Sequence, residues 1–149
     1  MSYTTKHQRL TQEKKLANIM ITEEMMPCLQ GALPSALATV DDNGTPNISY
    51  ISQVYYVDNN HVALSNQFFN KSMRNIKSNG RATVNVFRPD NLKSWYLELK
   101  HKESKSEGEL FDNMKMQLEA IASMMGMEDV FKLQASEVFE VVQVDEIKS

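Results

Sequence analysis

Hydrophobic and polar residues alternate along most of this chain, in six segments separated by turn-forming residues. The segments are residues 36–40 (ALATV), 47–57, 61–65 (HVALS), 81–87 (RATVNVF), 92–102 (LKSWYLELKHK) and 137–147. Alternation with a period of two predicts β-strands that bury one face. In the second segment this alternation places four large side chains on one face: Ile48, Tyr50, Val54 and Tyr56.

Short turn motifs separate the first three predicted strands. Asn43-Gly44 is typical of a two-residue hairpin turn, and Asp58-Asn59-Asn60 predicts a second turn. We therefore expect these three strands to form an antiparallel meander.

Capping residues predict two helices in the first part of the chain. Thr11 can cap a helix that runs to about residue 20. Thr22 precedes a shorter helix, which Pro27 makes irregular and Gly31 can end. We assign residues 1–21 to an N-terminal helical extension and residues 22–149 to a single domain.

Two more helices are predicted between later strands. Asn70 suits the N-cap of a helix that Gly80 closes in the left-handed conformation. The segment 106–109 (SEGE) fits the capping box S-x-x-E, with Ser106 as the cap. The helix after it carries an apolar stripe and ends near Gly126.

These elements predict an α+β fold that is mainly antiparallel β. Six alternating strands favour a small barrel, because closure removes exposed sheet edges, and the helices would flank it. A ferredoxin-like sandwich is the alternative, but that fold needs two comparable crossover helices.

Composition narrows the classes of function. The chain has 149 residues and a net charge of −3, so a general affinity for nucleic acid is not expected. Its start lacks the apolar run of a signal peptide, and no long apolar segment predicts a membrane span, so we expect a cytoplasmic protein. One cysteine and three scattered histidines offer no zinc spacing. His101 lies in a charged run and is expected to be solvated.

Charge is unevenly distributed along the chain. Residues 1–102 carry a net charge of +4, whereas residues 103–149 carry −7 and predict a solvated acidic surface. Lys71, Ser72 and Arg74 fall in the first turn of a predicted helix, where free N–H groups and the helix dipole favour an anion. This turn predicts a phosphate site without a glycine-rich loop. The alternative is a solvated basic face, with Met73 and Ile76 turned to the core.

Three strings in fixed order resemble the pyridoxamine 5′-phosphate oxidase-like family of FMN-binding split barrels. They are LPSALATVDDNGTPNISYIS, VALSNQFFNKSMRNIKSNGRATVNVF and FEVVQV, and the resemblance covers about residues 22–147. It implies a six-stranded split β-barrel that forms a homodimer, with FMN at the interface between the two chains.

The resemblance also implies which residues bind FMN. Its phosphate would be held at the end of the third strand and the start of the following helix, by Ser65, Asn66, Lys71, Ser72 and Arg74. The ring would lie along the second strand and meet mainly backbone groups, at Asn47, Ser49, Tyr50 and Ile51.

The sequence also departs from the biosynthetic oxidase. Asn47 stands where that enzyme has an arginine, and Phe69-Asn70-Lys71 replaces its S-R-K run. The Arg and His residues that hold its pyridoxal substrate have no counterpart that we can identify, so oxidation of pyridoxamine phosphate is not expected.

Several functions therefore stay open. The first is an FMN-dependent oxidoreductase of unknown substrate and unassigned catalytic residues. The second is a non-catalytic flavin-binding redox sensor or ligand-binding module. A third is a split barrel that binds heme or a deazaflavin instead of FMN.

Overall fold

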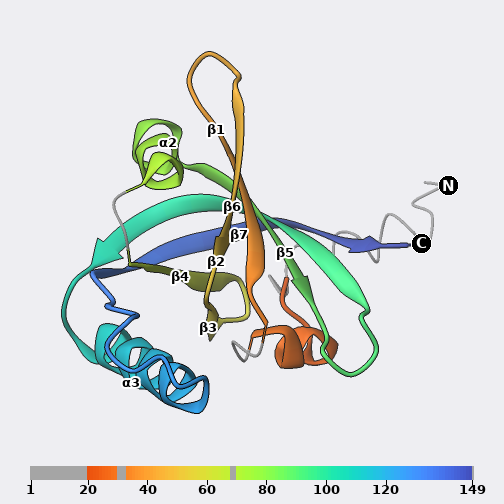
Figure 1. The fold of residues 1–149 in the computed structure, drawn as a ribbon. Coiled ribbons are helices and arrows are strands. Elements are labelled where there is room, and N and C mark those ends of the chain that lie inside the picture. Colours follow the sequence, from red (N-terminus) through yellow and green to blue (C-terminus); the bar gives the residue numbers. More distant parts are fainter. Residues whose placement is uncertain (1–19, 30–32, 68–69, 149) are drawn as a thin grey trace, which may run out of the picture.

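The computed structural model describes residues 20–29, 33–67 and 70–148, and within them an antiparallel sheet and three helices (Figure 1). The helices are the 3-10 helix η1 (Glu23–Leu29), α2 (Lys71–Asn79) and α3 (Glu109–Met124). The strands are β1 (Ser35–Val40), β2 (Pro46–Ile51), β3 (Val54–Asp58), β4 (His61–Asn66), β5 (Arg81–Phe87), β6 (Ser94–Lys105) and β7 (Ala135–Ile147). The helix predicted from Thr11 lies outside the described residues.

The strands form a single sheet in the order β2-β1-β5-β6-β7-β4-β3, with every pair antiparallel. The sheet curls around a core that includes Leu37, Val84, Leu97 and Phe139, all almost fully buried. The structure confirms the α+β class, consistent with a split barrel.

The sheet has seven strands among the described residues instead of the six predicted. The strand expected over residues 47–57 divides at Ser52 and Gln53 into β2 and β3, which lie at opposite edges of the sheet. Gln53 is buried, and its side chain donates to Gln117 of α3. Because this buried residue interrupts the strand, the predicted meander is wrong between β2 and β3.

The same break separates side chains that the alternation placed on one face. Ile48 and Tyr50 are 72% and 78% exposed, whereas Val54 is 2% exposed. Residues before the break follow the β1–β2 hairpin, and residues after it pair with β4.

The caps of α2 are those predicted, but the start of α3 is not. The Asn70 side chain accepts from the Met73 N–H, and Gly80 closes α2 at φ 74°. At α3 the N-cap is Gly108, at φ 99°, and no side chain caps the helix. Ser106 is displaced from the cap because β6 pairs with β7 as far as Lys105, which leaves only a short turn before the helix.

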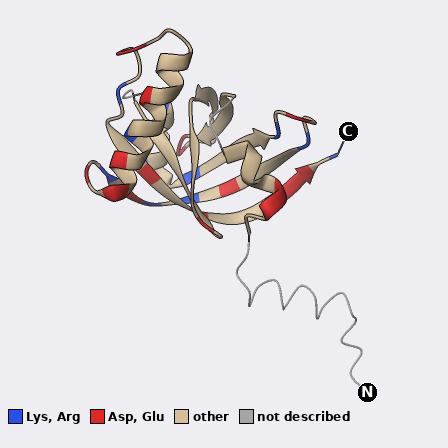
Figure 2. Cartoon of the chain, turned by 90° about the horizontal axis from the view of Figure 1, so that it is seen from below, with Lys and Arg blue, Asp and Glu red and all other residues tan. Residues whose placement is uncertain are grey.

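The acidic C-terminal part of the chain is largely a solvated surface, as predicted. Acidic residues mark α3, the turn before it and the end of β7 (Figure 2), and most of them are exposed. Glu137 is the exception, at 1% exposure. Within the described residues, no helix combines the length and apolar character needed to cross a bilayer.

Candidate functional site

Helix α2 is fastened to the inner faces of β1 and β2 by polar side chains. Asn47 Nδ2 donates to Ser72 Oγ at 2.9 Å, and the hydroxyls of Ser49 and Ser72 lie 2.7 Å apart. One turn further along, Asn75 Nδ2 donates to Thr39 Oγ1 at 3.1 Å. These bonds set the N-terminus of α2 beside the second strand.

The first turn of α2 combines a helix N-terminus with two cations. It has no acidic residue, and both Lys71 and Arg74 are exposed on its surface. The charge of Lys71 also reaches Asp41 in the β1–β2 turn. The pKa of Asp41 is lowered chiefly by the Thr45 N–H, with a smaller contribution from Lys71.

A small cavity of about 80 Å³ lies between the start of α2 and the ends of β2 and β4. Its walls are Leu37, Tyr50, Ile51, Ser52, Leu64, Ser65, Asn66, Gln67, Asn70, Ser72, Met73, Ile76, Phe131, Glu137 and Phe139.

The structure brings the predicted site residues together in three layers. The cavity wall includes Tyr50, Ile51, Ser65, Asn66 and Ser72. Asn47 and Ser49 lie behind the wall, bonded to Ser72. Lys71 and Arg74 are exposed on α2 and do not line the cavity.

Three consecutive residues at the end of β4 carry a buried polar atom without a hydrogen-bond partner. They are Ser65 Oγ, Asn66 Oδ1 and Gln67 Oε1, and all three residues line the cavity. Unpaired buried polar atoms are rare in proteins and call for a specific explanation. Such atoms fit a polar ligand with hydroxyl or N–H groups.

Sequence analysis missed the buried carboxylate of this wall. Glu137 Oε1 accepts from His101 Nε2 at 3.0 Å and from the Ser104 hydroxyl, and Oε2 accepts from Asn66 Nδ2 at 3.3 Å. His101 is therefore not solvated as expected. Its side chain is 18% exposed and meets the Phe139 ring edge-on, at 5.1 Å between centroids. The available signal was the position of Glu137 inside the apolar run of the last strand.

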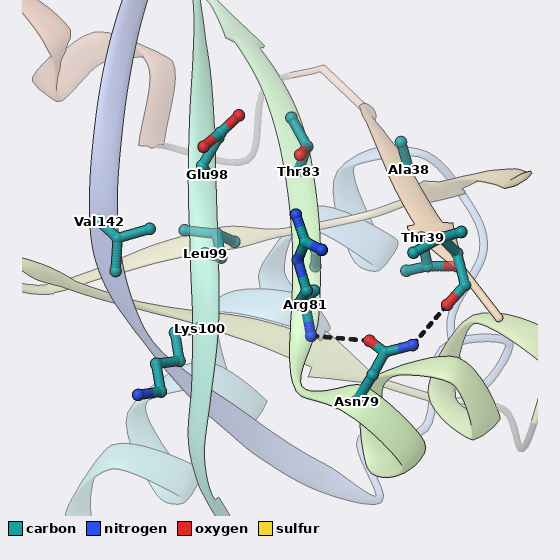
Figure 3. A pocket seen from close by; sticks show the side chains of 11 residues that line it. Ala38, Thr39, Asn79, Arg81, Thr83, Glu98, Leu99, Lys100 and Val142 are labelled. Atoms are coloured by element: carbon teal, nitrogen blue, oxygen red, sulfur yellow. Dashed lines mark hydrogen bonds between the residues drawn. The ribbon is translucent and has the colours of Figure 1, made fainter. Parts of the chain in front are cut away.

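A larger groove of about 490 Å³ lies along β1, β5 and β6 (Figure 3), and it shares no lining residue with this cavity. Arg81, Thr83 and Glu98 stand along it, and Asn79 at the end of α2 donates to the Val40 carbonyl at 2.7 Å. No residue of this groove has an unpaired buried polar atom among the described residues. Of the five unsatisfied groups in the described part of the chain, three therefore line the smaller cavity and none lines the groove; the other two, Gln53 Oε1 and Ser136 Oγ, belong to residues that line neither.

Around the cavity, the described residues form no metal site. Within residues 20–29, 33–67 and 70–148, no three His, Cys, Asp or Glu side chains form a group that could hold a metal ion.

Comparison with known structures finds the same fold in proteins of differing ligands. An FMN-binding protein from Syntrophomonas wolfei is 23% identical, with a TM-score of 0.70 over 95% of this chain and 98% of that one. An F420 reductase is 18% identical, with a TM-score of 0.62 over 84% and 98%. HutZ, the heme storage protein from Vibrio cholerae, is 18% identical, with a TM-score of 0.55 over 85% and 94%.

Sequence comparison identifies the family. No curated protein matches the chain. The family model described as pyridoxamine 5′-phosphate oxidase matches residues 21–142, which include the hairpin, the cavity and α2. The chain belongs to the pyridoxamine 5′-phosphate oxidase family.

Proposed function

We propose that this protein binds FMN at the cavity beside α2 and is an oxidoreductase of unknown substrate. The observation that carries the proposal is the row of unpaired buried polar atoms at Ser65, Asn66 and Gln67, next to a helix N-terminus flanked by cations. Family membership and the FMN-binding relative of the same fold support it. Bound FMN would supply the hydride or electron transfer, and the protein would hold and orient it.

In this proposal the phosphate lies at the exposed start of α2. Lys71 and Arg74 supply positive charge, and the free N–H groups of the first turn face the anion. The ring follows β2 past Tyr50 and Ile51, with Asn47, Ser49 and Ser72 fixing the strand against the helix. Ser65 and Asn66 complete the wall on the β4 side.

Flavin selectivity tests this arrangement. Quenching of flavin fluorescence by the ligand-free protein should rank FMN well above riboflavin, which has no phosphate, and FAD below FMN. The preference for FMN should shrink as salt is added, because phosphate contacts are ionic. Equal affinity for FMN and riboflavin would contradict a phosphate site at α2.

Replacement of Lys71 tests the location of the phosphate. Lys71→Ala removes one charge-assisted contact, worth about 1.5–3 kcal/mol, so FMN affinity should fall roughly 10- to 150-fold. Lys77→Ala removes the same charge from the last turn of α2 and should have a much smaller effect. Unchanged affinity in Lys71→Ala would place the phosphate elsewhere.

A non-catalytic flavin-binding sensor is the alternative within this proposal, and heme or F420 is the alternative cofactor suggested by two relatives of the same fold. The absorbance spectrum of the purified protein distinguishes flavin from heme. Anaerobic mixing of the flavin-loaded protein with NADH or NADPH then separates the two functions. Loss of the flavin absorbance within seconds supports an oxidoreductase. A flavin that stays oxidised supports the sensor.

We also propose a homodimer formed through the outer face of the sheet. Ile48 and Tyr50 are exposed on β2, and their strand partners Ala38 and Ala36 extend the same face across β1. Tyr96 of β6, also exposed, lies opposite Asn85 on that face. A second chain covering this face would bring its own residues near β2, where the single chain leaves its small cavity open.

Solution size tests the dimer. Light scattering at micromolar concentration should give twice the mass of the chain, and the interface should bury more than about 1,200 Å² in total. Ile48→Glu places a charge in that interface and should yield monomers. A wild-type monomer would overturn the dimer without touching the proposed phosphate site.

A further inference from the structure

The carboxylate of Glu137 is held from both sides. It stands on β7 at 1% exposure, and its Oε1 accepts from His101 and Ser104 of β6. Its Oε2 accepts from Asn66 Nδ2, at the end of β4. One buried acceptor in the cavity wall thus joins three neighbouring strands.

This contact fixes the orientation of the Asn66 side-chain amide. A carboxylate only accepts hydrogen bonds, so the amide must present its NH₂ group to Glu137. Its carbonyl oxygen, Oδ1, is then turned away from Glu137, and it is one of the buried atoms without a partner. Asn66 lines the cavity, so the unpaired atom there is an acceptor.

The neighbouring amide shows the same polarity. Gln67 Nε2 donates to Ser52 Oγ at 3.1 Å, and Gln67 Oε1 has no partner. Each of these two adjacent side chains therefore donates one hydrogen bond from its NH₂ group to the protein and leaves an unpaired carbonyl oxygen at the cavity wall. Phosphate oxygens are also acceptors, so the carbonyl oxygens of Asn66 and Gln67 disfavour a phosphate placed against them.

We propose that Glu137 is a positioning residue, which locks Asn66 so that its carbonyl oxygen receives a hydrogen bond from an N–H or O–H group of the ligand. The inference rests on the proposed flavin. It assigns the β4 end of the cavity to a neutral donor of the cofactor, the ring imide N–H or a ribityl hydroxyl. The phosphate is left to the Lys71 end of α2.

The near-isosteric change Glu137→Gln should reverse this polarity. The Gln carbonyl can keep the bonds from His101 and Ser104, which places the new NH₂ group opposite Asn66. Asn66 must then turn its carbonyl oxygen toward residue 137 and its NH₂ group into the cavity. An acceptor at the wall becomes a donor, while volume and burial stay the same.

The first readout uses the ligand-free protein. In wild type, NMR should show the Asn66 side-chain NH₂ protons protected from exchange with water, because they are bonded to a buried carboxylate. Glu137→Gln should speed that exchange at least tenfold. Ser104→Ala, which removes a bond only from Oε1, should leave it unchanged. Equal exchange in wild type and Glu137→Gln would overturn the proposed orientation.

The second readout is ligand affinity, measured by flavin fluorescence with FMN and with FMN methylated at N3. Glu137→Gln should weaken FMN binding about 10- to 100-fold. The ligand loses its hydrogen bond to Asn66, and its donor group then faces the Asn66 NH₂ group, which is also a donor. If the ring imide is the donor, methylation at N3 should lower the flavin affinity of the wild-type protein and should lower that of Glu137→Gln by less. If a hydroxyl is the donor, methylation has the same effect in both proteins.

The outcomes separate this inference from the proposed function. Unchanged FMN affinity in a folded Glu137→Gln protein overturns the role of Glu137, even if FMN binds tightly. Failure of the wild-type protein to bind FMN overturns the proposed function, and the role toward flavin falls with it. The exchange measurement still decides the orientation of Asn66 in that case.

Discussion

Cys28 shows how one residue's surroundings set its chemistry. It lies on η1 and is partly buried against the core. Burial raises the pKa of the thiol to about 11, although the charge of Arg88 opposes that shift. Nucleophilic attack needs the thiolate, so Cys28 should be inert at neutral pH.

Alkylation measures this directly. Iodoacetamide should modify Cys28 far more slowly in the folded protein than in urea at pH 7.5. The rate in the folded protein should rise with a midpoint near 11, against a usual value of 9.0. Because the folded state holds the thiol proton more tightly than the unfolded state, the contribution of Cys28 to stability should be fully present below about pH 9. That contribution should be lost as the pH rises through 11. A midpoint near 9 in the folded protein would contradict the buried thiol.

At the scale of elements, α2 depends on the conformation of the glycine that caps its C-terminal end. Gly80 adopts φ 74°, and its N–H bonds to the Ile76 carbonyl, while its own carbonyl accepts from the His101 N–H at 2.8 Å. An added Cβ would meet only the His101 Cβ, at 3.9 Å. There is room for a side chain, so only the backbone conformation resists substitution.

Two substitutions at Gly80 distinguish backbone strain from steric crowding. Gly80→Ala should lower the free energy of unfolding by about 1–2 kcal/mol, because L-residues disfavour this conformation. Gly80→Asn is larger but tolerates the left-handed region, so it should lose less. Urea denaturation of both variants checks the order. A greater loss in the Asn variant would point to crowding.

Local signals in the sequence predicted the two ends of α2. Contacts between distant segments determined the break between β2 and β3 and the start of α3. Asn70 and Gly80 act within their own helix, so their positions were readable. The break at Gln53 depends on burial against α3, and the failure of the Ser106 cap depends on how far β6 pairs with β7. No single segment contains that information.

The candidate site divides in the same way. Lys71 and Arg74 were identified from the start of a helix. Glu137 and His101 meet only because β6 and β7 pair, across 36 residues of sequence. A histidine in a charged run and a glutamate in an apolar strand carry no local sign of each other.

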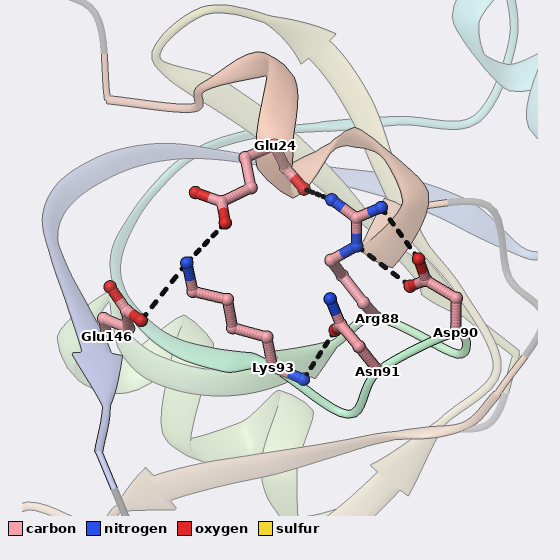
Figure 4. A network of polar contacts seen from close by, with 6 residues as sticks. All are labelled: Glu24, Arg88, Asp90, Asn91, Lys93 and Glu146. Carbon is pink, nitrogen blue, oxygen red and sulfur yellow. Dashed lines mark hydrogen bonds and ion pairs between the residues drawn. The ribbon is translucent and has the colours of Figure 1, made fainter.

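At the scale of the whole molecule, an ion-pair network connects η1, the β5–β6 turn and the end of β7 (Figure 4). Lys93 bonds to Glu24, and to Glu146 at 3.4 Å. Arg88 makes a two-pronged contact with Asp90 and donates to the Glu24 carbonyl at 3.0 Å. Contacts with Glu24 and then Glu146 raise the pKa of Lys93, and Arg88 lowers that of Asp90.

The network should make stability depend on pH in two windows. The Lys93 contribution is present below the usual lysine pKa of 10.5 and is lost as pH rises through its raised value. The Asp90 contribution is present above 3.8 and is lost as pH falls through its lowered value. The Tm difference between wild type and Lys93→Met should therefore vanish at high pH, and that for Asp90→Asn in acid.

Salt and a control variant complete that experiment. Both Tm differences should shrink in high salt, because the network is exposed. Lys132→Met removes an exposed lysine outside the network and should show no such pH window. A Lys93→Met difference that is constant from neutral to high pH would contradict the ionic origin.

The place of β7 in the sheet has a consequence for how the molecule forms. The last of the described strands pairs between β6 and β4, so it is interior to the sheet. During synthesis β4 and β6 emerge first, and each exposes an open edge until β7 leaves the ribosome. Such edges invite pairing with other chains. The same strand brings Glu137 to Asn66, so Glu137 cannot orient the Asn66 amide in a nascent chain until β7 has paired with β4.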